Sequence, residues 1–184
     1  MGLMIAGLLI FFAGHLLPTI PSVRDGLVAS LGPGRYRLVY SLVALAGLVL
    51  VAIGYSGREY IHVYAPSAAG RAMALHAMPL AFFLLAAANM KTWTRRLLRH
   101  PMSLGILIWA SLHLAANGDL YSVILFGSFA VYAVLSAVLA IARGKTKDDG
   151  MASLKYDGFA LLGAVLLYGL ILYAHGWLFG VALR

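Results

Sequence analysis

Residues 120–142 read LYSVILFGSFAVYAVLSAVLAIA, a run of 23 residues without a charged side chain. An α-helix needs about 20 mainly apolar residues to cross the hydrocarbon core of a bilayer. This run therefore predicts a membrane-spanning helix. The turn residues Asn117-Gly118-Asp119 come directly before it and predict a tight hairpin with the preceding apolar segment.

The whole chain shares this apolar character. Of its 184 residues, 62% are hydrophobic and 11% are charged, whereas soluble domains carry about 25% charged residues. This composition excludes a water-soluble enzyme and a disordered chain. The absence of cysteine removes disulfides, thiolate metal sites and cysteine nucleophiles. A net charge of +8 in such a chain indicates orientation in a membrane. The expected partner is the lipid bilayer, with no nucleic acid.

The charges and turn residues divide the chain into six apolar segments. The sequence therefore predicts an all-α fold, an integral membrane bundle of about six transmembrane helices forming one domain over residues 1–184. The expected spans are 2–20, 38–55, 72–90, 101–117, 120–142 and 159–183.

Lysine and arginine are divided unevenly between the expected loops. The loops after the first, third and fifth spans hold 11 of the 14 basic residues, and the other side holds Arg58, Arg71 and Arg184. Because cytoplasmic loops are enriched in Lys and Arg, this division predicts that both termini lie on the non-cytoplasmic side. The 11 residues are Arg24, Arg35, Arg37, Lys91, Arg95, Arg96, Arg99, Arg143, Lys145, Lys147 and Lys155.

Histidine is the ionisable residue that the expected spans contain, since they hold no Asp, Glu, Lys or Arg. His15, His76 and His113 lie within spans. A neutral imidazole is cheaper to bury than a carboxylate and is a common ligand of haem iron. Small residues around His113, with Trp109 one turn earlier, predict a flat recess that suits a porphyrin. The alternative is that these small residues allow close helix packing and that His113 bonds a neighbouring helix.

Depth in the membrane favours one pair of these histidines. At about 1.5 Å per residue, His113 lies roughly 18 Å from the cytoplasmic end of its span, His76 roughly 21 Å and His15 roughly 8 Å. By depth alone, His76 and His113 are the better axial pair. His62 and His175 are expected to be interfacial and to have no role.

Several motifs resemble the NnrU family, and the resemblance covers nearly the whole chain. The family is associated with bacterial denitrification, through nitrite and nitric oxide reduction, which implies a multi-pass protein of the bacterial inner membrane. It is also similar to plant 15-cis-zeta-carotene isomerase, a haem b membrane enzyme. The motifs are Gly14-His15-Leu16-Leu17-Pro18, Arg35-Tyr36, Arg99-His100-Pro101-Met102-Ser103-Leu104-Gly105, Trp109-Ala110, His113-Leu114-Ala115-Ala116-Asn117-Gly118-Asp119 and Leu125-Phe126-Gly127.

The resemblance implies a haem b cofactor with His15 and His113 as axial ligands, because these positions match the two histidine ligands of the isomerase. His76 stays as the alternative that depth favours. The isomerase has a cysteine where this chain has Ala110, so a mechanism that needs a thiolate ligand does not apply here. Three functions stay open: a haem protein of nitrogen-oxide metabolism with a small nitrogen-oxide ligand, a haem-dependent cis-trans isomerase of a carotenoid-like polyene, and a cofactor-free assembly factor.

The haem propionates are expected to turn toward cations at the cytoplasmic rim, because an unpaired carboxylate is costly in hydrocarbon. Arg99 and Arg35 are the best candidates, since a guanidinium fork matches a carboxylate. His100 lies beside Arg99 in the sequence, and Arg71 at the opposite rim is the next candidate. The alternative is that these residues only orient the protein. Arg95, Arg96 and Arg37 supply further positive charge at the same rim.

Overall fold

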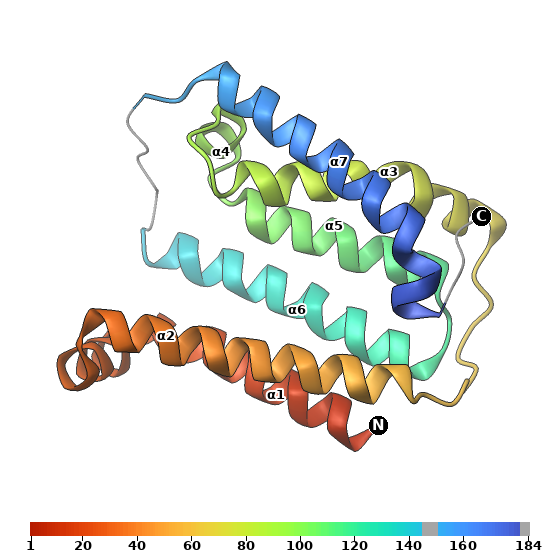
Figure 1. The fold of residues 1–184 in the computed structure, drawn as a ribbon, viewed down its shortest axis with the longest axis horizontal. Helices are drawn as coiled ribbons and strands as arrows, with labels where there is room; N and C mark the ends of the chain where they lie inside the picture. Colours follow the sequence, from red (N-terminus) through yellow and green to blue (C-terminus); the bar gives the residue numbers. More distant parts are fainter. Residues whose placement is uncertain (145–150, 181–184) are drawn as a thin grey trace. The chain divides into compact units, whose positions relative to one another are not determined.

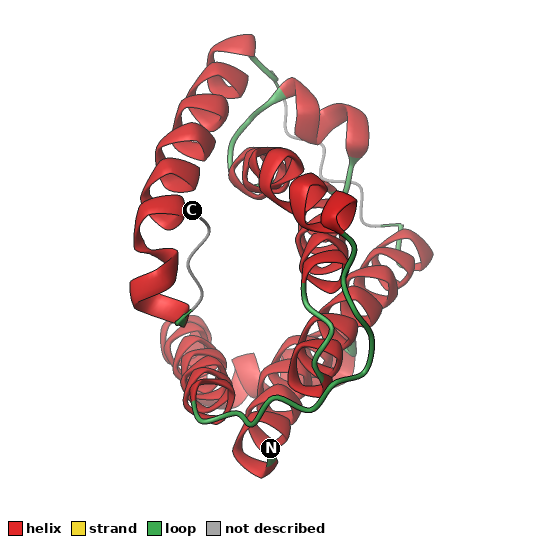
Figure 2. Ribbon diagram, turned by 90° about the vertical axis from the view of Figure 1, so that its right-hand side faces the viewer, coloured by secondary structure: helices red, strands yellow, loops and turns green. Residues whose placement is uncertain are grey.

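The structure is a computed structural model that describes residues 1–144 and 151–180. Figure 2 shows helices joined by loops, with no strand in these ranges. The all-α membrane fold class is confirmed. In chain order the elements are α1 (Gly2–Leu16), the 3-10 turn η1 (Leu17–Thr19), α2 (Pro21–Ser56), α3 (Ala68–Ala87), α4 (Trp93–Leu98), α5 (Pro101–Ala116), α6 (Leu120–Ala142) and α7 (Leu154–Phe179), labelled in Figure 1.

Five helical segments of the described chain are long and apolar enough to cross a membrane: α1 with η1, α2, α3, α6 and α7. The sixth expected span, α5, is a shorter apolar helix of 16 residues. It is short because Pro101 begins it and Asn117 ends it with an extended backbone. Lys145, Lys147, Arg184 and the last residues of the span expected at 159–183 lie outside the described residues.

The chain divides into two compact units, Met1–Tyr60 and Ile61–Arg184. The N-terminal unit is the pair α1 and α2, which run alongside each other (Figure 1). Glycine permits this contact: a Cβ added at Gly54 would lie 2.3 Å from the backbone nitrogen of Met4, and one at Gly7 would lie 2.6 Å from the carbonyl oxygen of Gly47. Small residues at such positions let membrane helices approach closely.

Helix α2 begins much earlier than the span expected at 38–55. Pro21 lies at its start, and the stretch that the sequence analysis assigned to a loop with Arg24 is helical. Gly32 interrupts the helix with φ 74° and ψ 157°, a conformation that favours glycine. Pro33 then begins the second helical stretch, where its fixed φ suits a first turn. The expected loop is therefore a helix followed by a kink, and Arg35 lies in the first turn after the kink.

The C-terminal unit is built around α3, which packs against both α5 and α7, while α6 packs against α5. Gly70 lies against the carbonyl group of Ala115, and Gly105 lies against the carbonyl group of Ala81. The start of α3 is therefore level with the end of α5, and the two helices are antiparallel. On the other side of α3, the hydroxyl of Tyr168 in α7 donates to the carbonyl of Leu75 at 2.7 Å.

A short helix that the sequence analysis missed, α4, lies between α3 and α5. Thr92 caps it by accepting from the backbone N–H of Arg95 at 3.0 Å. Asp157 in the first turn of α7 accepts from the backbone N–H groups of Trp93 and Thr94 at 2.8 and 3.1 Å, and from the Thr94 hydroxyl at 2.7 Å. A carboxylate at this end stabilises a helix and here also joins α4 to α7.

The hairpin predicted at Asn117-Gly118-Asp119 is confirmed, because these three residues join α5 to α6. Residues 61–66, which we call the strap, lie across this turn. Gly118 accepts from the backbone N–H of Val63 at 2.8 Å, and the strap carbonyl of Ile61 accepts from Leu120 at 2.8 Å. Tyr64 donates its hydroxyl to the carbonyl of Asn117 at 2.8 Å and to that of Leu114. The strap therefore pairs polar groups at the end of α5.

Replacing Gly118 by Ala should destabilise the protein, because the added Cβ would lie 1.8 Å from the carbonyl oxygen of Tyr64 and backbone must move. We expect the free energy of unfolding to fall by about 1–3 kcal/mol, the usual cost of overpacking. The midpoint of thermal unfolding in detergent micelles measures it. Gly127→Ala is the control, since nothing lies within 4 Å of its added Cβ. Equal midpoints for the two variants would contradict the strap geometry.

Candidate functional site

His113 lies in a group of aromatic rings between α5 and α6, which we call the aromatic cluster: Trp109, His113, Phe126 and Phe129. His113 is stacked on Phe126, with ring centroids 4.3 Å apart and planes 23° apart. Trp109 lies one turn before His113, with ring centroids 5.0 Å apart. It also makes edge contacts with Phe126 at 5.1 Å and Phe129 at 5.4 Å. The structure thus brings together two of the expected site residues, Trp109 and His113.

The hydrogen bond of His113 fixes its tautomer. Its Nδ1 lies 2.9 Å from the carbonyl oxygen of Trp109. A carbonyl oxygen only accepts, so Nδ1 carries the proton and donates. In the neutral ring the lone pair is then on Nε2, the nitrogen that can bind a metal. A backbone partner of this kind orients a metal-ligating histidine.

The small residues of α5 do not all flank His113. Gly105 packs against α3, where an added Cβ would lie 3.0 Å from the carbonyl oxygen of Ala81. The surroundings of His113 are instead the rings of Trp109 and Phe126. Gly105 therefore serves close helix packing, as one part of the alternative predicted, whereas His113 bonds a carbonyl of its own helix and not of a neighbouring one.

His15 has the same local arrangement in the N-terminal unit. Its Nδ1 lies 2.8 Å from the carbonyl oxygen of Phe11, one turn earlier, and its ring is stacked on Phe11 with centroids 4.1 Å apart. Tyr40 of α2 lies 5.4 Å from it, centroid to centroid. The two histidines that the resemblance implies as ligands thus share a tautomer and an aromatic neighbour at the same spacing. Arg35 lies five residues before Tyr40, roughly 8 Å along α2.

His76 lies in the middle of α3 with an exposed side chain. The register of α3 and α5 places it level with Ala110, roughly one turn from His113. The depth match expected from the sequence is therefore approximately preserved. His76 takes no part in the ring stacking of the aromatic cluster.

Arg99 and His100 lie at the opposite end of α5 from His113. Pro101 and His113 are 12 positions apart in one helix, which corresponds to roughly 18 Å. Arg99 has φ 58° and ψ −40°, and the N–H of His100 donates to the carbonyl of Leu98 at 2.6 Å. This is a strained γ-turn for a residue other than glycine. The geometry separates both residues from the aromatic cluster.

Arg71 lies at the end of the unit where His113 is found. It follows Gly70, which packs against Ala115 in the last turn of α5. Its guanidinium donates to the carbonyl of Pro66 in the strap at 2.7 Å, and the side chain is exposed. Among the described arginines of the C-terminal unit, Arg71 thus lies beside the His113 end of α5.

His175, which the sequence analysis expected to be interfacial, lies near the end of α7 and contacts Phe179, with ring centroids 5.0 Å apart. It lies four residues before the end of α7, and His113 lies three residues before the end of α5. The Tyr168–Leu75 hydrogen bond places this end of α7 beside the start of α3, where α5 ends.

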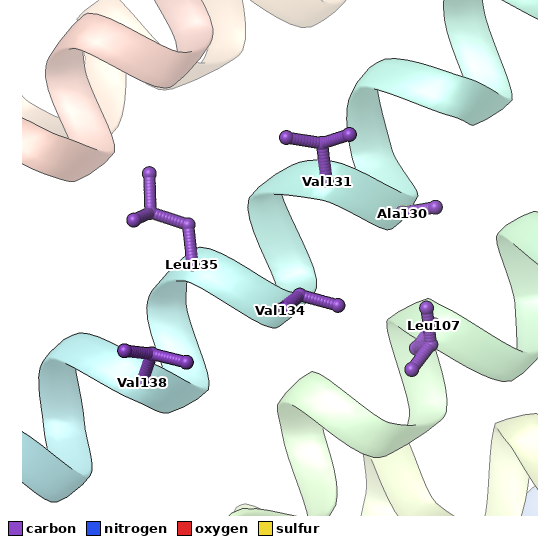
Figure 3. A pocket seen from close by; sticks show the side chains of 6 residues that line it. All are labelled: Leu107, Ala130, Val131, Val134, Leu135 and Val138. Carbon is purple, nitrogen blue, oxygen red and sulfur yellow. The ribbon is translucent and has the colours of Figure 1, made fainter.

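An apolar groove of about 450 Å³ runs along α6. Figure 3 shows Ala130 and Val134 turned toward Leu107 of α5, whereas Val131 and Leu135 lie along another side of α6. The groove begins near the aromatic cluster in the sequence, because Ala130 follows Phe129 and Leu107 lies two residues before Trp109. Its lining is wholly aliphatic and fits an apolar chain. The six lining residues are Leu107, Ala130, Val131, Val134, Leu135 and Val138.

These features define a multi-pass, all-helical membrane protein that carries histidines in aromatic surroundings. The particular family follows from comparison with known families: the model described as NnrU protein matches residues 3–183. The chain belongs to the NnrU family, and the match includes both compact units. No curated protein and no solved structure matches the chain.

Phe126→Ala should destabilise the C-terminal unit, because Phe126 is buried against His113 and Trp109. Removing a buried phenyl ring costs about 3–5 kcal/mol. Unfolding of the detergent-solubilised protein measures the change. Val131→Ala, at a side chain 69% exposed on the same helix, should change the stability little. If Phe126→Ala loses no more stability than Val131→Ala, the aromatic cluster does not stabilise the packing of α5 against α6.

Proposed function

We propose that this protein binds haem b through two axial histidines, His113 and His15. The observation that supports this most is the arrangement common to both residues. Each donates Nδ1–H to the carbonyl of an aromatic residue one turn earlier, at 2.8 Å for His15 and 2.9 Å for His113. Each ring is therefore held as the tautomer whose Nε2 can ligate iron. The family resemblance implies the same two residues.

The donor set of the chain fits haem better than a bare metal ion. The porphyrin supplies four nitrogen ligands, so haem iron needs one or two side chains from the protein. Structural zinc sites use four protein ligands, and catalytic ones use three. Within the described residues no group of three or more His, Asp or Glu side chains could hold a metal ion. Two histidines in apolar helices suit a flat, apolar macrocycle with its own donors. When bound, haem supplies one-electron chemistry and an iron that can bind a small ligand.

We further propose that the protein serves nitrogen-oxide metabolism in the bacterial inner membrane, as an accessory or redox component. This rests on the association of the NnrU family with denitrification and on the apolar helices of the chain. The uneven distribution of Lys and Arg supports an orientation with both termini outside the cytoplasm. A small nitrogen oxide is the proposed ligand of the iron, and it would have to displace one of the two histidines, because the porphyrin and both imidazoles fill the six coordination positions.

Replacing His113 by Ala should remove most of the bound haem, because the substitution removes an axial ligand held by the aromatic cluster. His15→Ala should also lower the haem content, because it removes the second proposed ligand. Haem per polypeptide, measured by the pyridine haemochrome after haem-replete expression, gives the answer. His62→Ala in the strap is the control and should keep the haem. If His76→Ala loses haem while His15→Ala keeps it, the pair favoured by depth is correct and the one implied by the resemblance is not.

The propionates of a haem on His113 are proposed to meet Arg71 rather than Arg99. Arg71 lies beside the last turn of α5, whereas Arg99 precedes its first turn, roughly 18 Å away. Arg35 is the candidate on the His15 side, because it lies five residues before Tyr40, whose ring contacts that of His15.

Arg71→Gln should weaken haem retention several-fold, since a charge-assisted bond to a carboxylate is lost. Arg99→Gln should retain haem like the parent and serves as the matched control. Haem titration into the apoprotein in detergent micelles compares them. If Arg99→Gln retains haem more weakly and Arg71→Gln has no effect, the propionates lie near Arg99 at the start of α5.

The groove along α6 favours one second candidate, a haem-dependent isomerase of a carotenoid-like polyene. Its aliphatic lining fits a linear apolar chain, and it begins close to the aromatic cluster in the sequence. Incubation of the reduced protein with cis-carotenoids, followed by chromatography of the isomers, tests this function. Conversion that Val134→Trp abolishes would support the groove as the site of the polyene, and absence of conversion would remove this candidate.

A further inference from the structure

The short helix α4 is a rigid element at the edge of the membrane part. It lies between two apolar helices, α3 and α5, so the chain leaves the apolar layer before α4 and re-enters it afterwards. Its first turn is held by Thr92 and by Asp157, as described above. The backbone of Ser153 also donates to the carbonyl of Lys91 at 3.1 Å, which brings the residues before α7 beside those before α4. The position of α4 on α7 is thus fixed by four hydrogen bonds from two segments.

Large apolar side chains are exposed at this position. Trp93 and Leu97 lie one turn apart on α4 and are 46% and 80% exposed. Leu154, which follows Ser153, is 73% exposed. Because α4 lies outside the membrane spans, its large apolar side chains would face water unless lipid or a protein partner contacts them. Tryptophan is also the side chain enriched where hydrocarbon meets the polar headgroups.

Positive charge surrounds these apolar side chains. The guanidinium of Arg96 lies over the ring of Trp93 at 5.1 Å, and Lys91 and Lys155 have exposed side chains. Among the described residues here, the carboxylate of Asp157 is already engaged by three hydrogen bonds from α4. The surface therefore combines an apolar face with basic groups. This is the pattern of an element that lies in the interface of an anionic bilayer.

We propose that Trp93, Arg96 and Leu97 of α4, with Lys91 and Leu154 beside them, form a binding surface for anionic phospholipid headgroups. Trp93 and Leu97 enter the boundary between headgroups and acyl chains, while Arg96 and Lys91 bind phosphate groups of the lipid. This surface is independent of the haem proposal, because none of its residues belongs to the aromatic cluster or to the surroundings of His15.

The test uses the full chain in bilayer nanodiscs made with phosphatidylcholine alone or with added phosphatidylglycerol. A variant with Trp109→Phe and Trp177→Phe leaves Trp93 as the single tryptophan. Quenching of the Trp93 fluorescence by lipids brominated near the glycerol end of their acyl chains is compared with quenching by acrylamide in the aqueous phase. Separately, the phosphatidylglycerol retained by the detergent-purified protein is measured by native mass spectrometry in the parent and in Arg96→Gln. Arg58→Gln is the matched control, because Arg58 also lies over an aromatic ring, that of Tyr55 at 4.0 Å.

The proposal expects quenching of Trp93 by brominated lipid, and about fivefold weaker phosphatidylglycerol binding in Arg96→Gln, the effect of one basic residue at an anionic surface. Arg58→Gln should bind like the parent, and haem content should be the same in all three proteins. Quenching by acrylamide but not by brominated lipid would overturn the proposal. Equal losses in Arg96→Gln and Arg58→Gln would overturn it as well. So would shielding of Trp93 that grows with protein concentration, since that outcome assigns the surface to a protein partner.

Discussion

An imidazole inside an apolar helix must have its N–H group paired within the protein, because hydrocarbon offers no partner. The structure meets this requirement in the same way at His15 and at His113, by donation to the carbonyl one turn earlier. Because Nδ1 carries the proton of this hydrogen bond, the lone pair of the neutral ring lies on Nε2. In both histidines Nε2 is then the nitrogen that carries the lone pair, and the rings of Phe11 and Phe126 are stacked on the two imidazoles.

The same requirement explains how α5 can be short. A helix that ends after 16 residues leaves its last carbonyl groups without partners in the helix. Asn117 donates both its backbone N–H and its side-chain amide to the carbonyl of His113, at 2.8 and 2.9 Å. Tyr64 of the strap donates to the carbonyls of Leu114 and Asn117. The strap and the hairpin turn together close the end of α5, and this closure keeps His113 in the aromatic cluster.

Apolar runs and proline or glycine signals predicted most of the fold. Residues 120–142 coincide with α6, and Pro101 begins α5 as expected, because both depend on local sequence. Residues 21–31 were assigned to a loop since they carry Arg24 and Asp25, yet they form a helix before the kink at Gly32. Helix α4 could not be read from its six residues, because it depends on Asp157, more than sixty residues away. The pairing of Trp109 with His113 followed from helical spacing, whereas Phe126 reaches His113 through tertiary packing.

The central proposal is that His15 and His113, each with its lone pair on Nε2, ligate haem iron. Electron paramagnetic resonance of the purified ferric protein, together with its absorption spectrum after haem-replete expression, tests this most directly. The account predicts one haem per chain, with a Soret band and a low-spin ferric signal typical of two axial histidines. A protein that folds normally in detergent and shows no Soret band would contradict it, and would leave these histidines as structural residues of a cofactor-free membrane protein.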